Sequence, residues 1–226
     1  MFQRIVRAAV LLAVTAGLFA SPAFAQTDQQ KLISAAETTL SNFIRDPQMK
    51  WLQQNLYRAK AVLIAPEVVK AGFIVGGSGG RSVLLARDPK SGEWRGPSFS
   101  NMATASVGFQ AGVAVSEAVT LVMTDKGFNS LLATSMKFGG DASVAAGPVG
   151  AGASADVVAD LVTFSRSKGV FGGLNLDGTV LTSADEWNQA FYGKKVLPPD
   201  ILVRGEVKNA QADKLRAAVA SAATKK

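Results

Sequence analysis

Two serine motifs in this sequence match patterns used by serine enzymes. Gly76 to Gly80 fits G-x-S-x-G, the turn that presents the nucleophile of many hydrolases, and Ser165 to Lys168 fits the S-x-x-K of penicillin-binding enzymes. The chain has no histidine to activate Ser78, and it lacks the S-D-N and K-T-G motifs that accompany S-x-x-K. We therefore interpret the first motif as a glycine turn or bulge and the second as a strand that enters a glycine turn.

Other chemical motifs are weaker. Gly150 to Ala155 fits G-x-G-x-x-A, but Pro148 precedes it and no clear helix pattern follows, whereas a dinucleotide site needs a strand before it and a helix after it. Zinc, copper and iron sites usually use histidine or cysteine, and the chain has neither. Glycoside hydrolysis by two carboxylates that meet in space stays open, as does calcium binding. The calcium candidates are Asp141, Asp156, Asp160 and Asp177, whose spacing fits no EF-hand. We expect no enzyme, no cofactor and no metal.

The first 25 residues have the pattern of an export signal. Arg4 and Arg7 precede an apolar stretch over residues 8–20, and an A-x-A cleavage site ends at Ala25. The apolar stretch is shorter than the roughly 20 residues that span a bilayer. We expect a signal peptide over residues 1–25, cleaved after Ala25, and one domain over residues 26–226 in the bacterial periplasm.

Positive charge is concentrated near the C-terminus. Residues 26–193 hold 14 basic and 14 acidic side chains, whereas residues 194–226 hold 8 basic and 3 acidic ones. A neutral body followed by a basic segment favours attraction to an anionic surface.

The elements that must position these residues fall into three parts. Asp28 to Arg45 has helical apolar spacing, and Gln211 to Thr224 is alanine-rich and helical. Between Gly72 and Gly178 lie 19 of the 22 glycines, among β-favouring runs, and Asp88 to Gly92 reads as a hairpin turn. Ser183 to Tyr192 predicts a helix opened by a capping box with Glu186. We predict an α+β fold: a twisted, mainly antiparallel sheet or partial barrel of short glycine-rich strands, with helices from both termini packed on it.

Ordered blocks between residues 59 and 193 resemble the SYLF domain, also described as an actin-binding domain in yeast endocytic proteins. The blocks that carry the resemblance are Pro66 to Gly77, Trp94 with Pro97 and Phe99, Val107 to Gly112, Gly140 to Gly150, Phe164 to Gly173 and Asn188 to Gly193. The resemblance implies a SYLF-like domain with its motif-bearing core over residues 59–193. The charge count and the alanine-rich spacing predict a basic helical tail over residues 194–226.

The resemblance implies binding to anionic phospholipid or a membrane surface, and not to nucleic acid. Because the chain carries a signal pattern and no SH3 or FYVE module, we do not expect actin binding. Basic side chains pair with lipid phosphates, and an exposed aromatic ring enters the interface, which makes the end of the S-x-x-K block the best candidate contact. The residues predicted to bind lipid are Arg166, Lys168, Phe171, Lys126, Lys137, Lys194 and Lys195. The alternative is a structural or protein-interaction module of the cell envelope without a lipid ligand.

Overall fold

The computed structural model describes residues 26–72, 75–107, 112–150, 157–167, 176 and 178–224. Its helices are α2 (Asp28–Arg45), α3 (Lys50–Asn55), α4 (Asp125–Leu131), α5 (Asp185–Tyr192) and α6 (Asp213–Ala222), and a π-helical turn covers Asp200–Arg204. Its strands are β1 (Ala61–Gly72), β2 (Val75–Arg87), β3 (Trp94–Val107), β4 (Gly112–Val122), β5 (Ser135–Lys137), β6 (Val144–Ala146), β7 (Leu161–Ser167) and β8 (Val180–Ser183).

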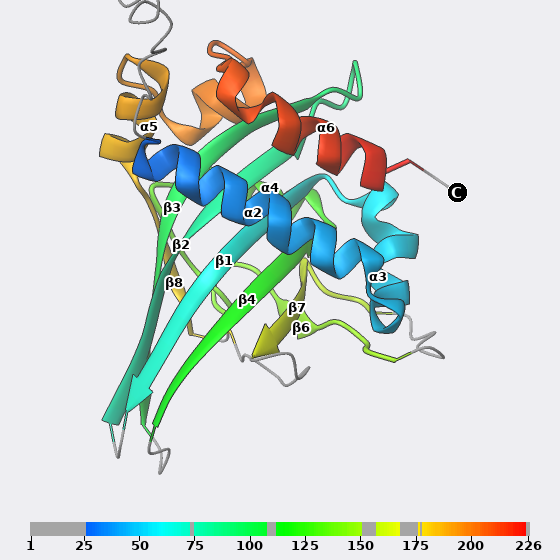
Figure 1. Cartoon of the computed structure of the whole chain (residues 1–226), viewed down its shortest axis with the longest axis vertical. Helices are drawn as coiled ribbons and strands as arrows, with labels where there is room; N and C mark the ends of the chain where they lie inside the picture. Colours follow the sequence, from blue (N-terminus) through cyan, green and yellow to red (C-terminus); the bar gives the residue numbers. More distant parts are fainter. Residues whose placement is uncertain are drawn as a thin grey trace, which may run out of the picture.

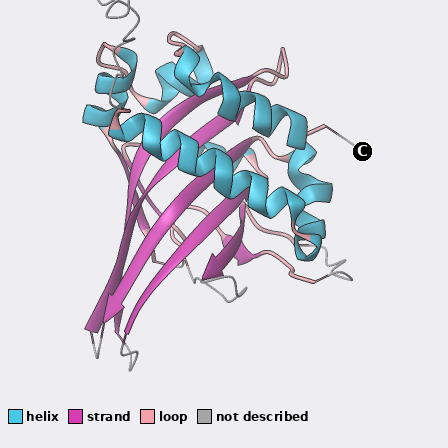
Figure 2. Ribbon diagram, in the orientation of Figure 1, coloured by secondary structure: helices cyan, strands magenta, loops and turns pink. Residues whose placement is uncertain are grey.

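The strands form one sheet in the order β5-β8-β3-β2-β1-β4-β7-β6. Every neighbouring pair is antiparallel except β6 and β7, which run parallel. The sheet curls into a half-barrel, with α2 and α6 across one face (Figures 1 and 2). This confirms the predicted α+β fold with a mainly antiparallel, partly closed sheet and helices from both ends of the chain.

The glycine-rich run Gly76 to Gly80, predicted as a turn or bulge, lies instead inside β2, which has 13 residues. The irregularity is in the facing strand, where the β1 register shifts between Ile64 and Glu67. The bulge brings the Glu67 carbonyl oxygen to within 2.3 Å of where a Cβ atom on Gly80 would lie. Glycine is therefore required opposite the bulge, and it does not end the strand.

Helix α2 begins at a capping box, because the Thr27 side chain accepts from the Gln30 backbone and the Gln30 side chain accepts from the Thr27 backbone. Its buried residues lie on one side, as the apolar spacing predicted, and they include Ala36, Leu40 and Phe43. They pack on the strand residues that point toward the helices, such as Val62, Ile64, Val83, Phe99 and Val119. Burial of these side chains fixes α2 on the sheet.

A second core fills the opposite, concave face of the sheet. Leu63 and Leu84 point into it from the central strands, and Phe138 and Ile201 cover them from later in the chain. Strands β5 and β6, the two edges of the sheet, are connected through residues 138–143, which includes a bridge between Phe138 and Ala142. The connection between the edge strands keeps the sheet curled.

The C-terminal segment is packed into the fold and is not a free tail. Leu215 and Val219 of α6 are fully buried against the helix-covered face, and Arg216 is buried and donates to the Gly96 carbonyl. Three of its cations form ion pairs: Arg204 with Asp200 and Glu206, Lys208 with Glu93, and Arg216 with Asp213. The positive surplus of residues 194–224 is thus carried by Lys194, Lys195 and Lys214.

The structure confirms the predicted hairpin turn at Asp88 and contradicts the predicted helix start at Ser183. The Asp88 carboxylate accepts from the Lys90 and Ser91 amides, which lowers the pKa of Asp88, and Gly92 closes the predicted hairpin turn at φ 73°. The predicted start of a helix at Ser183 is wrong, because Ser183 pairs with Ser100 as the last residue of β8 and α5 begins at Asp185. No helix within the described ranges is long and apolar enough to cross a membrane.

Candidate functional site

The serines of both motifs lie within strands. Ser78 pairs with Lys70 on β1 and with Thr104 on β3, so it is part of a regular ladder and not of an exposed elbow. Ser165 pairs with Ala118 in the middle of the β4–β7 ladder, whereas the S-x-x-K enzymes place their serine at the start of a helix. Neither serine therefore has the backbone geometry that its motif requires.

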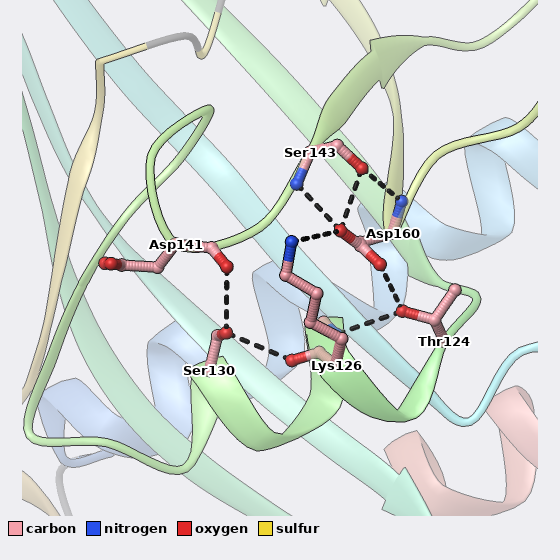
Figure 3. A network of polar contacts seen from close by, with 7 residues as sticks. Thr124, Lys126, Ser130, Asp141, Ser143 and Asp160 are labelled. Atoms are coloured by element: carbon pink, nitrogen blue, oxygen red, sulfur yellow. Dashed lines mark hydrogen bonds and ion pairs between the residues drawn. The ribbon is translucent and has the colours of Figure 1, made fainter.

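A polar network around Asp160 connects α4 to the strands β6 and β7 (Figure 3). The Asp160 carboxylate accepts from the Thr124 hydroxyl at 2.5 Å and from the Ser143 amide and hydroxyl at 2.9 and 2.8 Å. The Asp160 amide in turn donates to the Ser143 hydroxyl at 2.9 Å. The Thr124 hydroxyl also caps α4 by accepting from the Gly127 amide. The network therefore fixes the start of α4 and the loop before β7.

Hydrogen bonds from Thr124 and Ser143, with a weaker contribution from the Lys126 ammonium, lower the pKa of Asp160 from 3.8 to about 2. A carboxylate with so low a pKa is ionised at neutral pH and is a poor general base. Asp141, another calcium candidate, accepts from the Lys137 amide at 2.6 Å. In the described part of the chain, no group of three or more acidic side chains could hold a metal ion. Asp156 and Asp177 lie outside the described residues.

Arg166, the central residue of the predicted lipid contact, forms an ion pair with Glu117 on β4. The Arg166 guanidinium also lies 5.8 Å from the centre of the Phe43 ring of α2. Only 23% of the Arg166 side chain and 18% of the Glu117 side chain are exposed. Lys168 and Phe171 lie outside the described residues. The proposed lipid contact by Arg166 stays a prediction, and the structure gives this residue a partner in the protein.

The predicted lysines lie at two ends of the sheet. Lys137 is exposed on β5 and pairs with Val180 on β8, and Val180 pairs with Ala103 on β3. This row lies toward the end of the sheet where β1 ends and β4 begins. Lys126 lies on α4, which follows the other end of β4, where its ammonium is 3.6 Å from the Asp160 carboxylate. Lys194 and Lys195 follow α5, at the end of the molecule opposite the free strand ends (Figure 1). The fold thus does not bring these lysines into one cluster.

An open cavity of about 690 Å³ lies between α2, α3 and α6, and the sequence did not indicate it. Leu40, Ile44 and Ala218 contribute apolar wall, and Arg45 is the one charged side chain that lines it among the described residues. Arg45 forms no ion pair with any residue that the structure describes. Polar residues, among them Ser41, Gln53 and Gln54, line the rest, and a mixed wall with a single cation suits an anionic amphiphile. Sequence patterns missed this site because its walls come from helices at opposite ends of the chain.

Comparisons with known proteins identify relatives of this chain. Residues 103–222 match the family described as Ysc84: Las17-binding protein actin regulator. SH3 domain-containing YSC84-like protein 1 is 34% identical to the chain in Bos taurus and 33% in Homo sapiens, over 70% of this chain and 47% of the relative. LAS seventeen-binding protein 3 of Saccharomyces cerevisiae is 37% identical over 61% of this chain and 31% of the relative. The chain thus spans less than half the length of these relatives, and it belongs to the Ysc84, or SYLF, domain family.

Proposed function

We propose that this chain is an exported, non-enzymatic protein that binds anionic phospholipid through basic side chains. The observation that carries the proposal is the set of exposed lysines that no described carboxylate neutralises in an ion pair, on a fold that belongs to the SYLF family. These lysines include Lys137, Lys194 and Lys195. A lysine near an anionic membrane contributes about 1 kcal/mol of attraction.

The non-enzymatic part of the proposal rests on the chemistry of the described side chains. The buried carboxylate of Asp160 is held ionised by hydrogen bonds, and Ser78 and Ser165 lie in ladders without a histidine anywhere in the chain. A serine-directed fluorophosphonate probe tests this part. Covalent labelling of Ser78 or Ser165 would contradict the non-enzymatic part of the proposal.

Co-sedimentation with vesicles tests the lipid-binding function. The chain from Gln26 onward is mixed at low salt with vesicles of phosphatidylglycerol and with neutral vesicles of phosphatidylcholine. We expect binding to the anionic vesicles that weakens as salt is added, because exposed charges are screened beyond about 10 Å at 0.1 M ionic strength. Equal or absent binding to both vesicle types would contradict the proposal. N-terminal sequencing of the protein from a bacterial periplasm tests the export signal, with Gln26 as the expected first residue.

The cavity between α2, α3 and α6 supports a second candidate function, the retention of one anionic amphiphile. Its volume falls within the range of roughly 300–1,000 Å³ that is usual for small-molecule sites. Native mass spectrometry of the purified protein would detect a retained phospholipid, and R45Q would then lose it. The matched control is R58Q, because Arg58 is also exposed and next to Tyr57 of the cavity but does not line it.

The names of the relatives point to protein binding, and the family description refers to actin regulation. We do not extend actin binding to this chain, in keeping with its signal pattern. An envelope-protein partner remains the competing proposal. It predicts that a tagged chain retains an acidic partner protein while anionic vesicles fail to bind it.

A further inference from the structure

The four central strands continue past the helices. Glu67 on β1 pairs with Arg81 on β2. From the next pair to the described end of β1, no pair of residues on these two strands contains both a positive and a negative side chain. Beyond the Glu67–Arg81 pair lie residues 68–72, 76–80, 102–105 and 113–116, which we call the distal segment. Figure 1 shows these strand ends extending clear of α2 and α6. The one charged residue in the distal segment is Lys70, and it contains no carboxylate.

The distal segment has an apolar face on the same side of the sheet as α2. Val69 pairs with Val115 and with Gly79, and Ala71 pairs with Val113 and with Gly77. The face is completed on β3 by Ala103 and Ala105, the partners of Gly79 and Gly77. Exposure reaches 66% at Val113, 42% at Val115 and 37% at Val69. Small apolar side chains on neighbouring strands thus form a flat surface that nothing in the described chain covers.

On the opposite face of the distal segment, the row of Lys70, Ser78 and Thr104 is polar, and the row before it contains the buried Val68 and Met102. Lys70 pairs with Ser78, which pairs with Thr104, and the Thr104 hydroxyl lies 2.6 Å from that of Thr179. The alternation follows from the two-residue period of a strand. Within this segment β1 is paired on both sides, with β2 and β4, so its backbone hydrogen bonds are satisfied inside the sheet. The outer edges of β3 at residues 104–105 and of β4 at residues 113–115 have no partner strand among the described residues, so the segment suits the headgroup region, where water is present, and not the hydrocarbon core.

The position of Lys70 along β1 predicts how far the distal segment enters a leaflet. Lys70 lies two residues from Gly72, the last described residue of β1, and a strand rises roughly 3.4 Å per residue, which places them about 7 Å apart. Interfacial elements bury their apolar face about 5–10 Å into the boundary between headgroups and acyl chains. The cation is therefore at the height of the phosphates when the final rows reach the acyl boundary. Lys137 is nearly level with it, because Lys137, Val180 and Ala103 form the row that continues to Val69.

We propose that the distal segment of β1–β4 inserts into the headgroup region of an anionic phospholipid leaflet, with the apolar face of Val69, Val113 and Val115 in the interface and Lys70 at the lipid phosphates. This inference rests on the proposed lipid-binding function and names the surface that performs it. A segment with an apolar face, one cation on its other face and no carboxylate matches the chemistry of such a leaflet. It assigns the bilayer contact to the end that holds Lys137, away from Lys126, Lys194 and Lys195.

Site-specific labelling tests the insertion directly, because the chain has no cysteine. V113C carries an environment-sensitive fluorophore in the distal segment, and V158C carries it at a valine that is 97% exposed elsewhere. We expect phosphatidylglycerol vesicles to shift the emission of the label at position 113 to the blue and a lipid-borne quencher to reduce it. The label at position 158 should be unaffected.

Charge substitution gives the second measurement. V113D combined with V115D should lower the affinity for phosphatidylglycerol vesicles by at least about tenfold, because the lipid phosphates repel both carboxylates and each charge near an anionic surface contributes about 1 kcal/mol. V158D is the matched control and should bind as the unaltered chain does. Circular dichroism confirms that both variants are folded.

The outcomes separate the two proposals. Vesicle binding without a response at position 113, or unchanged binding of the V113D/V115D variant, overturns the insertion and leaves the lipid-binding function intact. A blue shift that depends on protein concentration without vesicles shows that a second copy covers the face, and it also overturns the insertion. If the unaltered chain binds no vesicles, the proposed function fails and the insertion fails with it.

Discussion

The Thr39 hydroxyl on α2 donates a hydrogen bond of 2.9 Å to Glu117 on β4, and the other oxygen of the same carboxylate pairs with Arg166 on β7. One carboxylate thus connects the first helix to two strands of the sheet. Thr39 and Glu117 are 78 residues apart in sequence, and Glu117 and Arg166 are 49 apart. This connection marks where the helix-covered part of the sheet ends and the distal segment begins.

Loss of either partner of the Arg166–Glu117 pair should destabilise the fold. The pair is mostly buried, so we expect E117A or R166A to lower the free energy of unfolding by about 2 kcal/mol, between the effects of exposed and fully buried pairs. Urea denaturation measures the change. K31A is the control, because the exposed pair of Lys31 with Asp28 should contribute no more than about 0.5 kcal/mol. Equal stability of all three variants would contradict the prediction.

The same variants test whether Arg166 contacts lipid. Direct contact predicts that R166A weakens binding to phosphatidylglycerol vesicles, while E117A, which removes a negative charge, does not weaken it. A purely structural role predicts the same affinity for both variants under conditions where both are folded.

The lowered pKa of Asp160 should make the free energy of unfolding depend on pH in the acidic range. Its pKa is about 2 in the folded chain and 3.8 is the ordinary value, so the unfolded chain takes up the proton first as the pH falls. The stabilisation is therefore complete above about pH 4 and is lost between pH 4 and pH 2. D160N should flatten the pH dependence in this window and lower stability at pH 7 by about 2 kcal/mol, since hydrogen bonds to a charged group contribute about 1.5–3 kcal/mol.

Denaturant titrations at several pH values measure the effect. D125N is the control, because Asp125 is exposed and pairs with Lys60 at the surface. An unchanged slope in D160N below pH 4 would mean that Asp160 is not the group responsible.

The bulge opposite Gly80 predicts a difference between two adjacent glycines. A Cβ atom on Gly80 would lie 2.3 Å from the Glu67 carbonyl oxygen, whereas one on Gly79 would meet the nearest atom, the Met102 carbonyl oxygen, at an ordinary 3.6 Å. G80A should therefore cost about 1–3 kcal/mol through overpacking against the backbone. G79A should be neutral or slightly stabilising, because alanine loses less conformational freedom on folding than glycine does. Thermal unfolding compares the two, and equal melting temperatures would show that the bulge relaxes.

The sequence was sufficient to predict the fold class and the helices at both ends. The apolar spacing around Leu40 and Phe43 has a helical period, and local spacing is what determines which side of a helix is buried. It failed at Ser183, where a capping-box pattern was overridden by pairing with Ser100. It also failed at Gly76 to Gly80, because pairing on both sides makes a strand of residues with low strand propensity.

The candidate site was harder to predict because its features depend on pairing between distant residues. The charge of Arg166 beside a serine predicts a lipid contact, and nothing in the sequence around it indicates that Glu117 is its partner. The charge of the segment after Lys194 predicts a basic tail, whereas Leu215 and Val219 have the apolar spacing of a packed helix and are buried. The apolar face of the distal segment becomes visible only when the register of four strands is known.

Neutralising single lysines should reveal which end of the molecule faces the bilayer. If the distal segment inserts, K70Q should weaken binding to phosphatidylglycerol vesicles about fivefold, which corresponds to the roughly 1 kcal/mol of one lysine near an anionic surface. K194Q combined with K195Q should then have little effect, because these residues lie at the other end of the molecule (Figure 1). The prediction from charge distribution alone is the reverse, with the double variant weaker by more than tenfold. Vesicle affinities measured at one low salt concentration decide between them. A large loss in the double variant with none in K70Q would place the lipid contact beside α5 and remove the distal segment from it.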